Sequence, residues 1–211
     1  MAADRLILVR HGRTASNAAG VWQGHLDTPL DEVGHNESHS AATALCPLEQ
    51  PSRIVSSDLK RAMATAAPMA AAWGLQVELD PQLREVNAGA WEGLGRAEIH
   101  AQWPDDLAAW KAGHDVAIGG AERMSEAGAR VARRLTELVT ETDGTLVVVS
   151  HGGAIRMAVL VLLGLQEAPG RALRTMRNAH WAVLIRGASG TFSLDGWNLG
   201  PELTAANPAM P

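Results

Sequence analysis

Short apolar runs alternate with longer helical stretches along most of the chain. Two runs, RLILV at residues 5–9 and TLVVVS at residues 145–150, are apolar at every or nearly every position, which is typical of central strands in a parallel sheet. The other predicted strands are 52–57, 75–80 and a closing hairpin of 181–187 with 191–197. Because strands alternate with helices, the pattern predicts a three-layer α/β/α fold with a mostly parallel central sheet.

The stretches between these strands carry helical signals. Residues 32–46 are rich in alanine, and residues 121–139 repeat apolar side chains at helical spacing. In the stretch after residue 57, Asp58 is a candidate N-cap and Pro68 predicts a kink or a break. A further helix is predicted to begin at the Gly152–Gly153 pair and to end near Gly164.

Two segments do not follow the alternation. Residues 83–118 contain three tryptophans among scattered polar residues, and we interpret them as a small helical lid inserted beside the sheet. Residues 198–211 are rich in Pro, Ala and Asn and are predicted to form a flexible tail. The expected organisation is therefore a single domain over residues 1–197, followed by that tail.

Composition limits the classes of partner and compartment. The 211 residues carry a formal net charge of −5, so no basic excess favours nucleic acid or an anionic membrane surface. The single cysteine, Cys46, cannot form an internal disulfide, which favours a reducing, cytoplasmic location. The longest apolar run, residues 157–165, is too short to span a bilayer, and no membrane partner is expected.

Titratable and basic side chains follow three of the predicted strands. Arg10 and His11 come after the first strand, Arg61 after the second and His151 after the strand at 145–150. Since ligands bind at the carboxyl ends of strands in open α/β sheets, these four side chains are expected to meet at one rim. Arginine forks match a tetrahedral oxyanion, and a histidine can act as a nucleophile, so the set suits phosphoryl transfer through a phosphohistidine. This chemistry requires neither a metal nor a cofactor.

Five motifs in order resemble a known family. RHGRTASN, QGHLDTPLDEVG, SSDLKRAMATA, LREVNAGAWEGL and SHGGAIR, spread over residues 5 to about 187, are similar to the successive signatures of the histidine phosphatase superfamily, also called phosphoglycerate mutase-like. The resemblance implies that fold, with the lid as an insertion. It also implies a phosphatase that acts on a small phosphorylated metabolite.

The resemblance assigns roles residue by residue. His11 is the expected nucleophile, with its other ring nitrogen donating to a backbone carbonyl. Glu85 is the expected proton donor to the leaving alcohol, and bound phosphate is expected to favour its protonated form. The remaining implied site residues are Arg10, Arg61 and His151 for the phosphoryl group, and Asn17, Gln23, Gly24 and Gly152 to complete the pocket.

Some positions depart from the family pattern or have structural alternatives. GAERM stands where the family often has GGES and leaves Glu122 as the match, so contacts near the leaving group are open. Trp22 and Trp91 either line the pocket or pack, with packing favoured. His35 and His39 have a spacing that suits a metal but lack an evident third ligand.

The sequence is compatible with three functions. We favour a metal-independent phosphomonoesterase, because the chain is short between WEGL and GAERM, where a cofactor-dependent phosphoglycerate mutase carries a longer insert. The mutase is the second possible function, and a non-catalytic phosphate-binding protein is the third. For the substrate, NAHWAVL followed by LDGWN is similar to glucosyl-3-phosphoglycerate phosphatases, while a broad sugar phosphatase or an α-ribazole-phosphate phosphatase fits the same pocket. The resemblance to the family also allows a homodimer that forms through the edge of the predicted 181–197 hairpin.

Overall fold

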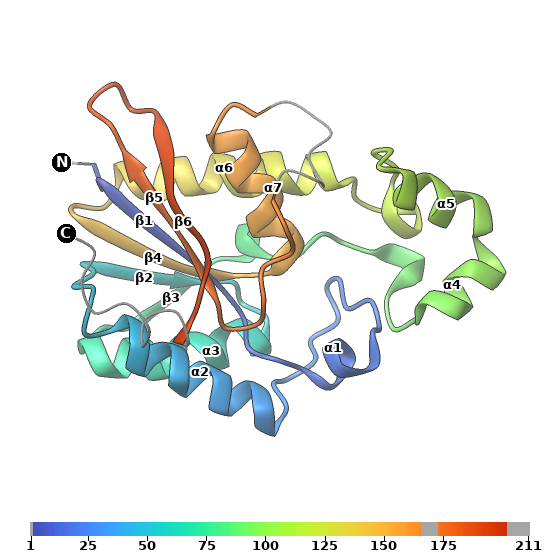
Figure 1. Cartoon of the computed structure of the whole chain (residues 1–211), viewed down its shortest axis with the longest axis horizontal. Helices are drawn as coiled ribbons and strands as arrows, with labels where there is room; N and C mark the ends of the chain where they lie inside the picture. The colour runs from blue at the N-terminus through green and yellow to red at the C-terminus, as the bar shows by residue number, and fades with distance from the viewer. Residues whose placement is uncertain (1, 166–172, 202–211) are drawn as a thin grey trace.

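The computed structural model describes residues 2–165 and 173–201, and its centre is one six-stranded sheet. The strand order is β3-β2-β4-β1-β5-β6 (Figure 1). The strands are β1 (Arg5–Arg10), β2 (Arg53–Ser56), β3 (Val77–Leu79), β4 (Thr145–Ser150), β5 (Trp181–Arg186) and β6 (Phe192–Leu199). The first four are parallel, and β5 and β6 add an antiparallel hairpin at the β1 edge. The predicted α/β class is confirmed.

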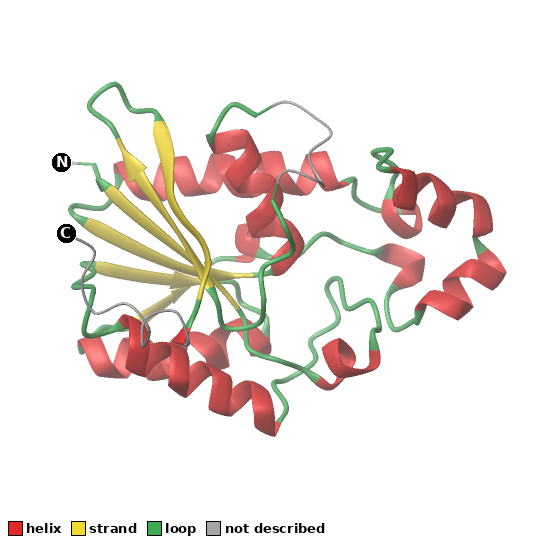
Figure 2. Cartoon of the chain, in the orientation of Figure 1, coloured by secondary structure: helices red, strands yellow, loops and turns green. Residues whose placement is uncertain are grey.

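Two helical layers cover the sheet (Figure 2). One layer consists of α2 (Glu32–Leu45) and α3 (Lys60–Trp73), and the other of α6 (Met124–Thr140) and α7 (Gly152–Leu162). Successive β1 side chains alternate between them, since Leu6 and Leu8 pack with α6 and α7 whereas Ile7 and Val9 pack with α2 and α3. Burial on both faces explains why this strand is a continuous apolar run and not an alternating one. No helix in the described part of the chain is long and apolar enough to cross a membrane.

Helix α3 differs from the sequence prediction in two respects. It continues through Pro68 to Trp73, so the predicted break does not occur. Asp58 is not its N-cap, because its carboxylate accepts hydrogen bonds from Arg84, with Oδ1 2.7 Å from Nε. The free N–H at the start of the helix, on Lys60, donates instead to Asp27 Oδ1 at 2.7 Å. A carboxylate from a distant loop therefore satisfies a donor that local sequence assigned to Asp58.

The inserted segment is helical, and it builds a small core of its own. It contains α4 (Arg96–Gln102) and α5 (Pro104–Ala112), together with the short 3₁₀ turns η2 (Gly89–Trp91) and η3 (Ile118–Gly120). Its apolar cluster includes Val86, Trp91 and Ile99. Leu83, at the end of the 3₁₀ turn η1 (Pro81–Leu83), packs in the main core with the sheet. The first residue of the predicted lid, Leu83, thus packs with the main core.

The C-terminal boundary also differs from the prediction. Strand β6 runs to Leu199, so residues 198 and 199 belong to the sheet and not to a tail. The rest of the predicted tail falls almost entirely on residues 202–211, outside the described residues. The short helix α1 (Ala15–Ala19) follows β1 and lies beside the carboxyl ends of the strands, facing the lid (Figure 1).

Candidate active site

A pocket of about 330 Å³ lies at the carboxyl end of the parallel strands, between α1, the lid and the start of α7. Because β1, β4 and β2 are neighbours in the sheet, the segments that follow them meet here. Eight of the nine residues singled out in the sequence line the pocket: Arg10, His11, Asn17, Gln23, Gly24, Arg61, Glu85 and Gly152. The ninth, His151, lies behind them and is fully buried.

His11 is fixed in one orientation and one tautomer. Its Nδ1–H donates to the carbonyl oxygen of Gly12 at 2.7 Å, which leaves Nε2 as the nitrogen with a free lone pair. Burial, reinforced by the charges of Arg10 and Arg61, lowers the pKa of His11 well below its ordinary value. The imidazole is therefore neutral at pH 7, which is the state a nucleophile needs.

The backbone around His11 is held by close packing. The Gly12 N–H donates to Thr65 Oγ1 at 2.9 Å, and the His11 carbonyl accepts from Asn178 Nδ2 at 2.9 Å. A side chain at position 12 would bring its Cβ within 2.5 Å of the Gly34 carbonyl oxygen, so glycine is required by close approach of two backbones. The glycine of the first motif thus has a packing role.

His151 supports Arg61 and does not open onto the pocket. Its ring centroid lies 5.2 Å from that of His11. Arg61 Nε donates to His151 Nδ1 at 3.2 Å, and His151 Nε2 is 2.9 Å from Ser57 Oγ, so both ring nitrogens are engaged. Burial, together with the charge of Arg61, lowers the pKa of His151 well below its ordinary value. His151 is thus a neutral imidazole that accepts from Arg61, and it adds no positive charge of its own.

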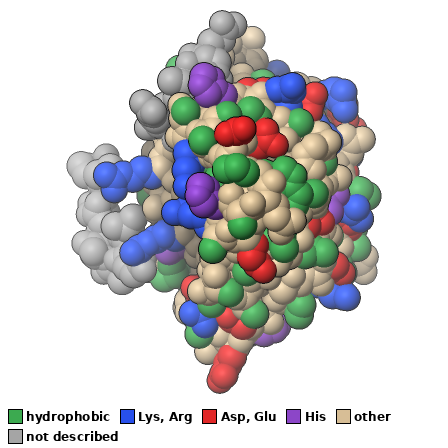
Figure 3. Space-filling view, turned by 90° about the vertical axis from the view of Figure 1, so that its right-hand side faces the viewer, with side chains coloured by type: hydrophobic (Ala, Val, Ile, Leu, Met, Phe, Trp, Pro, Cys, Tyr) green, Lys and Arg blue, Asp and Glu red, His purple; other side chains and the backbone are tan. Residues whose placement is uncertain are grey.

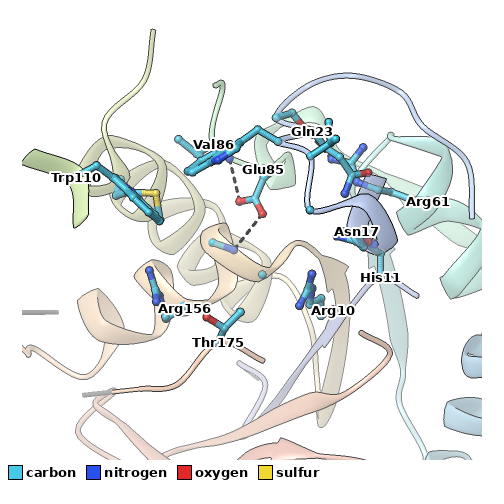
Figure 4. Close-up of a pocket in the computed structure, with 17 residues that line it drawn as sticks. Arg10, His11, Asn17, Gln23, Arg61, Glu85, Val86, Trp110, Arg156 and Thr175 are labelled. Carbon is cyan, nitrogen blue, oxygen red and sulfur yellow. Dashed lines mark hydrogen bonds between the residues drawn. The ribbon is translucent and has the colours of Figure 1, made fainter. Parts of the chain in front are cut away.

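The two predicted arginines point into the pocket from fixed positions (Figure 4). Arg61 is fully buried, and its Nη1 and Nη2 donate to the Leu26 and Gly24 carbonyls at 2.6 and 2.8 Å. Arg10 donates through Nη1 to the Met176 carbonyl. Its Nε is buried without a hydrogen-bond partner among the described residues. Both guanidiniums are therefore held by backbone carbonyls, and no carboxylate of a described residue forms an ion pair with either.

The Glu85 carboxylate is held against the first turn of α7. Its carboxylate accepts from the backbone N–H groups of Gly153 at 3.0 Å and Ala154 at 2.8 Å, and from its neighbour Val86 at 3.0 Å. Figure 4 shows the carboxylate between the Val86 backbone and α7, turned toward the pocket. A Cβ at position 153 would lie 2.8 Å from Glu85 Oε1, so the second glycine of the SHGGAIR motif lets the carboxylate approach the helix end.

A second layer of contacts holds the segment that carries Glu85. Arg130 forms a bidentate ion pair with Glu122, with both N–O distances 2.9 Å. The same guanidinium donates to the backbone carbonyls of Gln82, Arg84 and Glu85 at 2.7, 3.1 and 3.2 Å. Glu122 Oε2 also accepts from the Asn87 N–H at 2.9 Å. Glu122, which the sequence left without a clear role, thus anchors the Glu85 loop through Arg130.

Several pocket residues were not predicted as such. Trp22 lines the pocket as well as packing, with its ring centroid 5.2 Å from that of Trp110 and 5.4 Å from that of Trp91. Trp91 is fully buried and only packs. The other unpredicted lining residues include Val86, Met124, Arg156 and Thr175. The sequence could have predicted Arg156 as a pocket residue, because it lies one helical turn after Gly152 and Gly153 in the same motif. No sequence pattern indicated Trp110 or Thr175.

The remaining sequence candidates lie outside the pocket. His39 Nδ1 is 2.9 Å from the carbonyl oxygen of His35, one helical turn earlier, and the described residues contain no group of three metal-ligating side chains.

Figure 3 looks onto the end of the molecule that carries the lid and α1. Along one side of this face Lys and Arg side chains gather beside a histidine, in a chain whose overall charge is negative.

Several known proteins are similar to this chain in sequence. The model of the histidine phosphatase superfamily (branch 1) matches residues 6–200. The chain is 37% identical over 221 residues to a glucosyl-3-phosphoglycerate phosphatase of Mycobacterium tuberculosis, covering 97% of this chain and 99% of the relative. It is 35% identical over 178 residues to a probable phosphoglycerate mutase, GpmB, of Yersinia enterocolitica, covering 82% and 81%.

Solved structures agree with these sequence matches. A mycobacterial glucosyl-3-phosphoglycerate phosphatase complexed with VO3 superposes with a TM-score of 0.85 at 38% identity, over 94% of this chain and all of that one. A phosphoserine phosphatase mutant of Entamoeba histolytica gives a TM-score of 0.81 at 26% identity, over 92% and 96%. Ordered motifs, sheet topology and full-length relatives agree, and the chain belongs to the histidine phosphatase superfamily.

Proposed function

We propose that this chain is a phosphomonoesterase that acts through a phosphohistidine on His11 and needs no metal. The observation that carries this proposal is the neutral His11 ring, whose Nδ1 is bound to the Gly12 carbonyl and whose Nε2 is free beside Arg10 and Arg61. A fixed, unprotonated nucleophile next to two guanidiniums suits attack on a phosphoryl dianion.

The reaction has two steps. In the first, His11 Nε2 forms a bond to phosphorus while the bond from phosphorus to the ester oxygen breaks, and Glu85 gives its proton to the departing alkoxide. In the second, water attacks phosphorus, the N–P bond breaks, and the Glu85 carboxylate takes the proton from water. Arg10 and Arg61 neutralise the phosphoryl oxygens throughout. Asn17 and the segments at Gln23–Gly24 and Gly152 complete the cradle around them.

His151 has a positioning role in this proposal. The sequence motif implied direct binding of the phosphoryl group, but the residue is fully buried and both its ring nitrogens are engaged. We therefore assign it the task of orienting Arg61, whose Nε it accepts. Removing the imidazole would leave that donor buried and unpaired, which costs roughly 1–3 kcal/mol.

For the substrate, we propose a glycosylated phosphoglycerate of the glucosyl-3-phosphoglycerate kind. The full-length relatives named for that substrate support it, and so do two tryptophans, Trp22 and Trp110, that line the pocket with half-buried rings. Flat apolar ring surfaces with a few polar groups around them suit a sugar, which presents C–H faces and hydroxyl edges. A mutase is less supported, since the mutase relative covers less of the chain.

The central test is trapping of the intermediate. The protein is reacted with an aryl phosphate whose phosphoryl group is labelled, and the reaction is quenched rapidly without acid. The wild-type chain should carry the label in a bond that is stable to base and labile to acid, and His11→Ala should carry none. His114→Ala, an exposed histidine in the lid, is the matched control and should label normally. Labelling of the His11 variant at the wild-type level would contradict the mechanism.

Two further comparisons separate the roles and the substrate. Glu85→Gln should lower kcat/KM by roughly 10²- to 10⁴-fold for alkyl phosphates, which need a proton on the leaving oxygen. For a nitrophenyl ester kcat/KM, which reports formation of the phosphohistidine, should be nearly unaffected, whereas kcat should fall because water then lacks its base. Glucosyl-3-phosphoglycerate should have a higher kcat/KM than unglycosylated 3-phosphoglycerate, and Trp22→Leu should remove that preference. Interconversion of phosphoglycerates that depends on a bisphosphoglycerate, without phosphate release, would favour the mutase.

A further inference from the structure

Arg156 is a half-buried cation of the pocket, and Glu85 is the described residue whose charge acts on it, without direct contact. No hydrogen bond or ion pair to a described residue involves its guanidinium, and its Nε is shielded from solvent and unpaired. Arg10 and Arg61, by contrast, donate to backbone carbonyls. Because an unpaired buried donor costs free energy, an orphan guanidinium at the edge of a binding pocket indicates a ligand that completes it.

The position of Arg156 separates it from the phosphoryl cradle. It projects from α7 one turn beyond the Gly152–Gly153 pair, on the pocket side of the helix. In Figure 4 it lies across the pocket from His11, with Arg10 between them and Thr175 beside it. A group held by Arg156 is therefore a part of the substrate other than the phosphoryl group on His11.

The charges of the pocket indicate what that group is. Three guanidiniums line the pocket, those of Arg10, Arg61 and Arg156, and among the described lining residues Glu85 is the only acid. When Glu85 carries the proton that it donates, the three positive charges match the two of a phosphoryl dianion plus one more negative charge. A guanidinium fork matches the two oxygens of a carboxylate, and the Thr175 hydroxyl can donate to one of them.

We propose that Arg156, assisted by Thr175, binds a carboxylate on the leaving alcohol of the substrate. This proposal rests on the proposed phosphatase function and extends it: the substrate class is a phosphomonoester that bears a carboxylate close to the ester oxygen. A neutral analogue leaves one guanidinium unmatched, so Arg156 selects for acids. The residue contributes to substrate specificity and takes no part in bond making.

The test uses a pair of substrates that differ only in that group. 3-Phosphoglycerate carries the carboxylate, and glycerol 3-phosphate has a hydroxymethyl group in its place. In Arg156→Gln the ratio of kcat/KM for the acid to that for the alcohol should fall roughly 10- to 100-fold, because one charged hydrogen-bonded contact is lost. The fall should appear mainly as a higher KM for the acid.

Two variants serve as comparisons. Arg156→Lys keeps the charge but loses the fork, so it should fall between wild type and Arg156→Gln. Arg96→Gln removes an exposed lid arginine outside the pocket and should leave the ratio unchanged. Inhibition by inorganic phosphate should be the same in all of these proteins, which also shows that each has folded.

Different failures point to different errors. An unchanged ratio in Arg156→Gln overturns the carboxylate assignment while leaving the phosphatase proposal intact. Equal losses for both substrates, with weaker inhibition by inorganic phosphate, overturn it as well, since Arg156 then belongs to the phosphoryl cradle. Calorimetric binding of the same two compounds to His11→Ala tests the contact without turnover. There Arg156→Gln should weaken only the acid, even if the chain hydrolyses neither compound.

Discussion

Arg130 offers a sharp test of whether the scaffold around Glu85 matters for proton donation. The change is Arg130→Gln, which removes the bidentate pair with Glu122 and the donors to the backbone that leads into Glu85. Arg130 is not one of the residues that line the pocket, so the variant leaves the chemical groups of the lining unchanged. Any effect on catalysis must therefore pass through the position of Glu85.

The magnitude follows from the contacts. The guanidinium makes five hydrogen bonds, two to the Glu122 carboxylate and three to carbonyls, and the side chains of the pair are 21% and 18% exposed. Breaking a fully buried pair costs about 3–5 kcal/mol, and partial exposure reduces this to roughly 2–3 kcal/mol. The catalytic effect should be about a 10²-fold loss of kcat/KM, the low end for a displaced general acid.

The assay is a series of phosphomonoesters that span good and poor leaving groups. Wild type should respond weakly to the leaving group, because Glu85 protonates it. In Arg130→Gln, kcat/KM should fall about 10²-fold for alkyl phosphates and by no more than about threefold for nitrophenyl phosphate. Urea unfolding of both proteins gives the stability difference in parallel.

Arg134 provides the control on the same helix. It pairs with Asp80 at 2.5 Å and Glu137 at 2.9 Å, and its side chain is 22% exposed, but within the described residues it donates to none of the backbone carbonyls of residues 82–85. Arg134→Gln should lose comparable stability without a change in leaving-group dependence. Equal slowing of aryl and alkyl esters in Arg130→Gln, or the selective pattern in Arg134→Gln, would refute the reasoning.

Three other outcomes are expected. Because the pKa values of buried His11 and His151 lie well below 6.5, the unfolded chain binds more protons below that pH. Unfolding free energy measured by urea titration should therefore fall between pH 6.5 and 5.5, by up to about 1.4 kcal/mol per pH unit for each histidine, and a flat profile would contradict this. Gly34→Ala, whose Cβ would lie 1.9 Å from the Arg13 carbonyl oxygen, should lower stability by roughly 2–3 kcal/mol and reduce activity, whereas Gly144→Ala in open space should cost only about 1 kcal/mol. Burial raises the pKa of the Cys46 thiol to about 11, so iodoacetamide should modify it slowly at neutral pH and quickly in urea; equal rates would be inconsistent with that burial.

The parts of the fold that the sequence predicted are those with a strong local signal. The apolar runs of β1 and β4 are recognisable because both faces of each strand are buried. The start of α7 is marked by its glycines, which fit the backbone to Glu85 and Arg10. The N-terminus of α3 was misplaced because its donor is satisfied by Asp27, a residue far away in sequence whose approach depends on the tertiary structure.

The same distinction applies to the site. His11, Arg10 and Arg61 were predictable because they follow β1 and β2, parallel strands of one sheet that are separated only by β4, so position along the chain implied position in space. Trp110 reaches the pocket from the lid, and Thr175 from the loop before β5, neither of which has a periodic pattern to orient it. The burial of His151 behind Arg61 depends on contacts with Ser57 and Arg61, in the segment that follows β2, and had no sequence signal.

The place of β4 in the sheet has a consequence for synthesis of the protein. β4 lies between β1 and β2, and no pairing joins those two earlier strands directly. A chain still on the ribosome cannot close its sheet until residues 145–150 have emerged, and until then the apolar strand β1 lacks its parallel neighbour. Chains cut short by a premature stop before that point would be inactive and prone to aggregate, so the cell would depend on chaperones or proteases to deal with them.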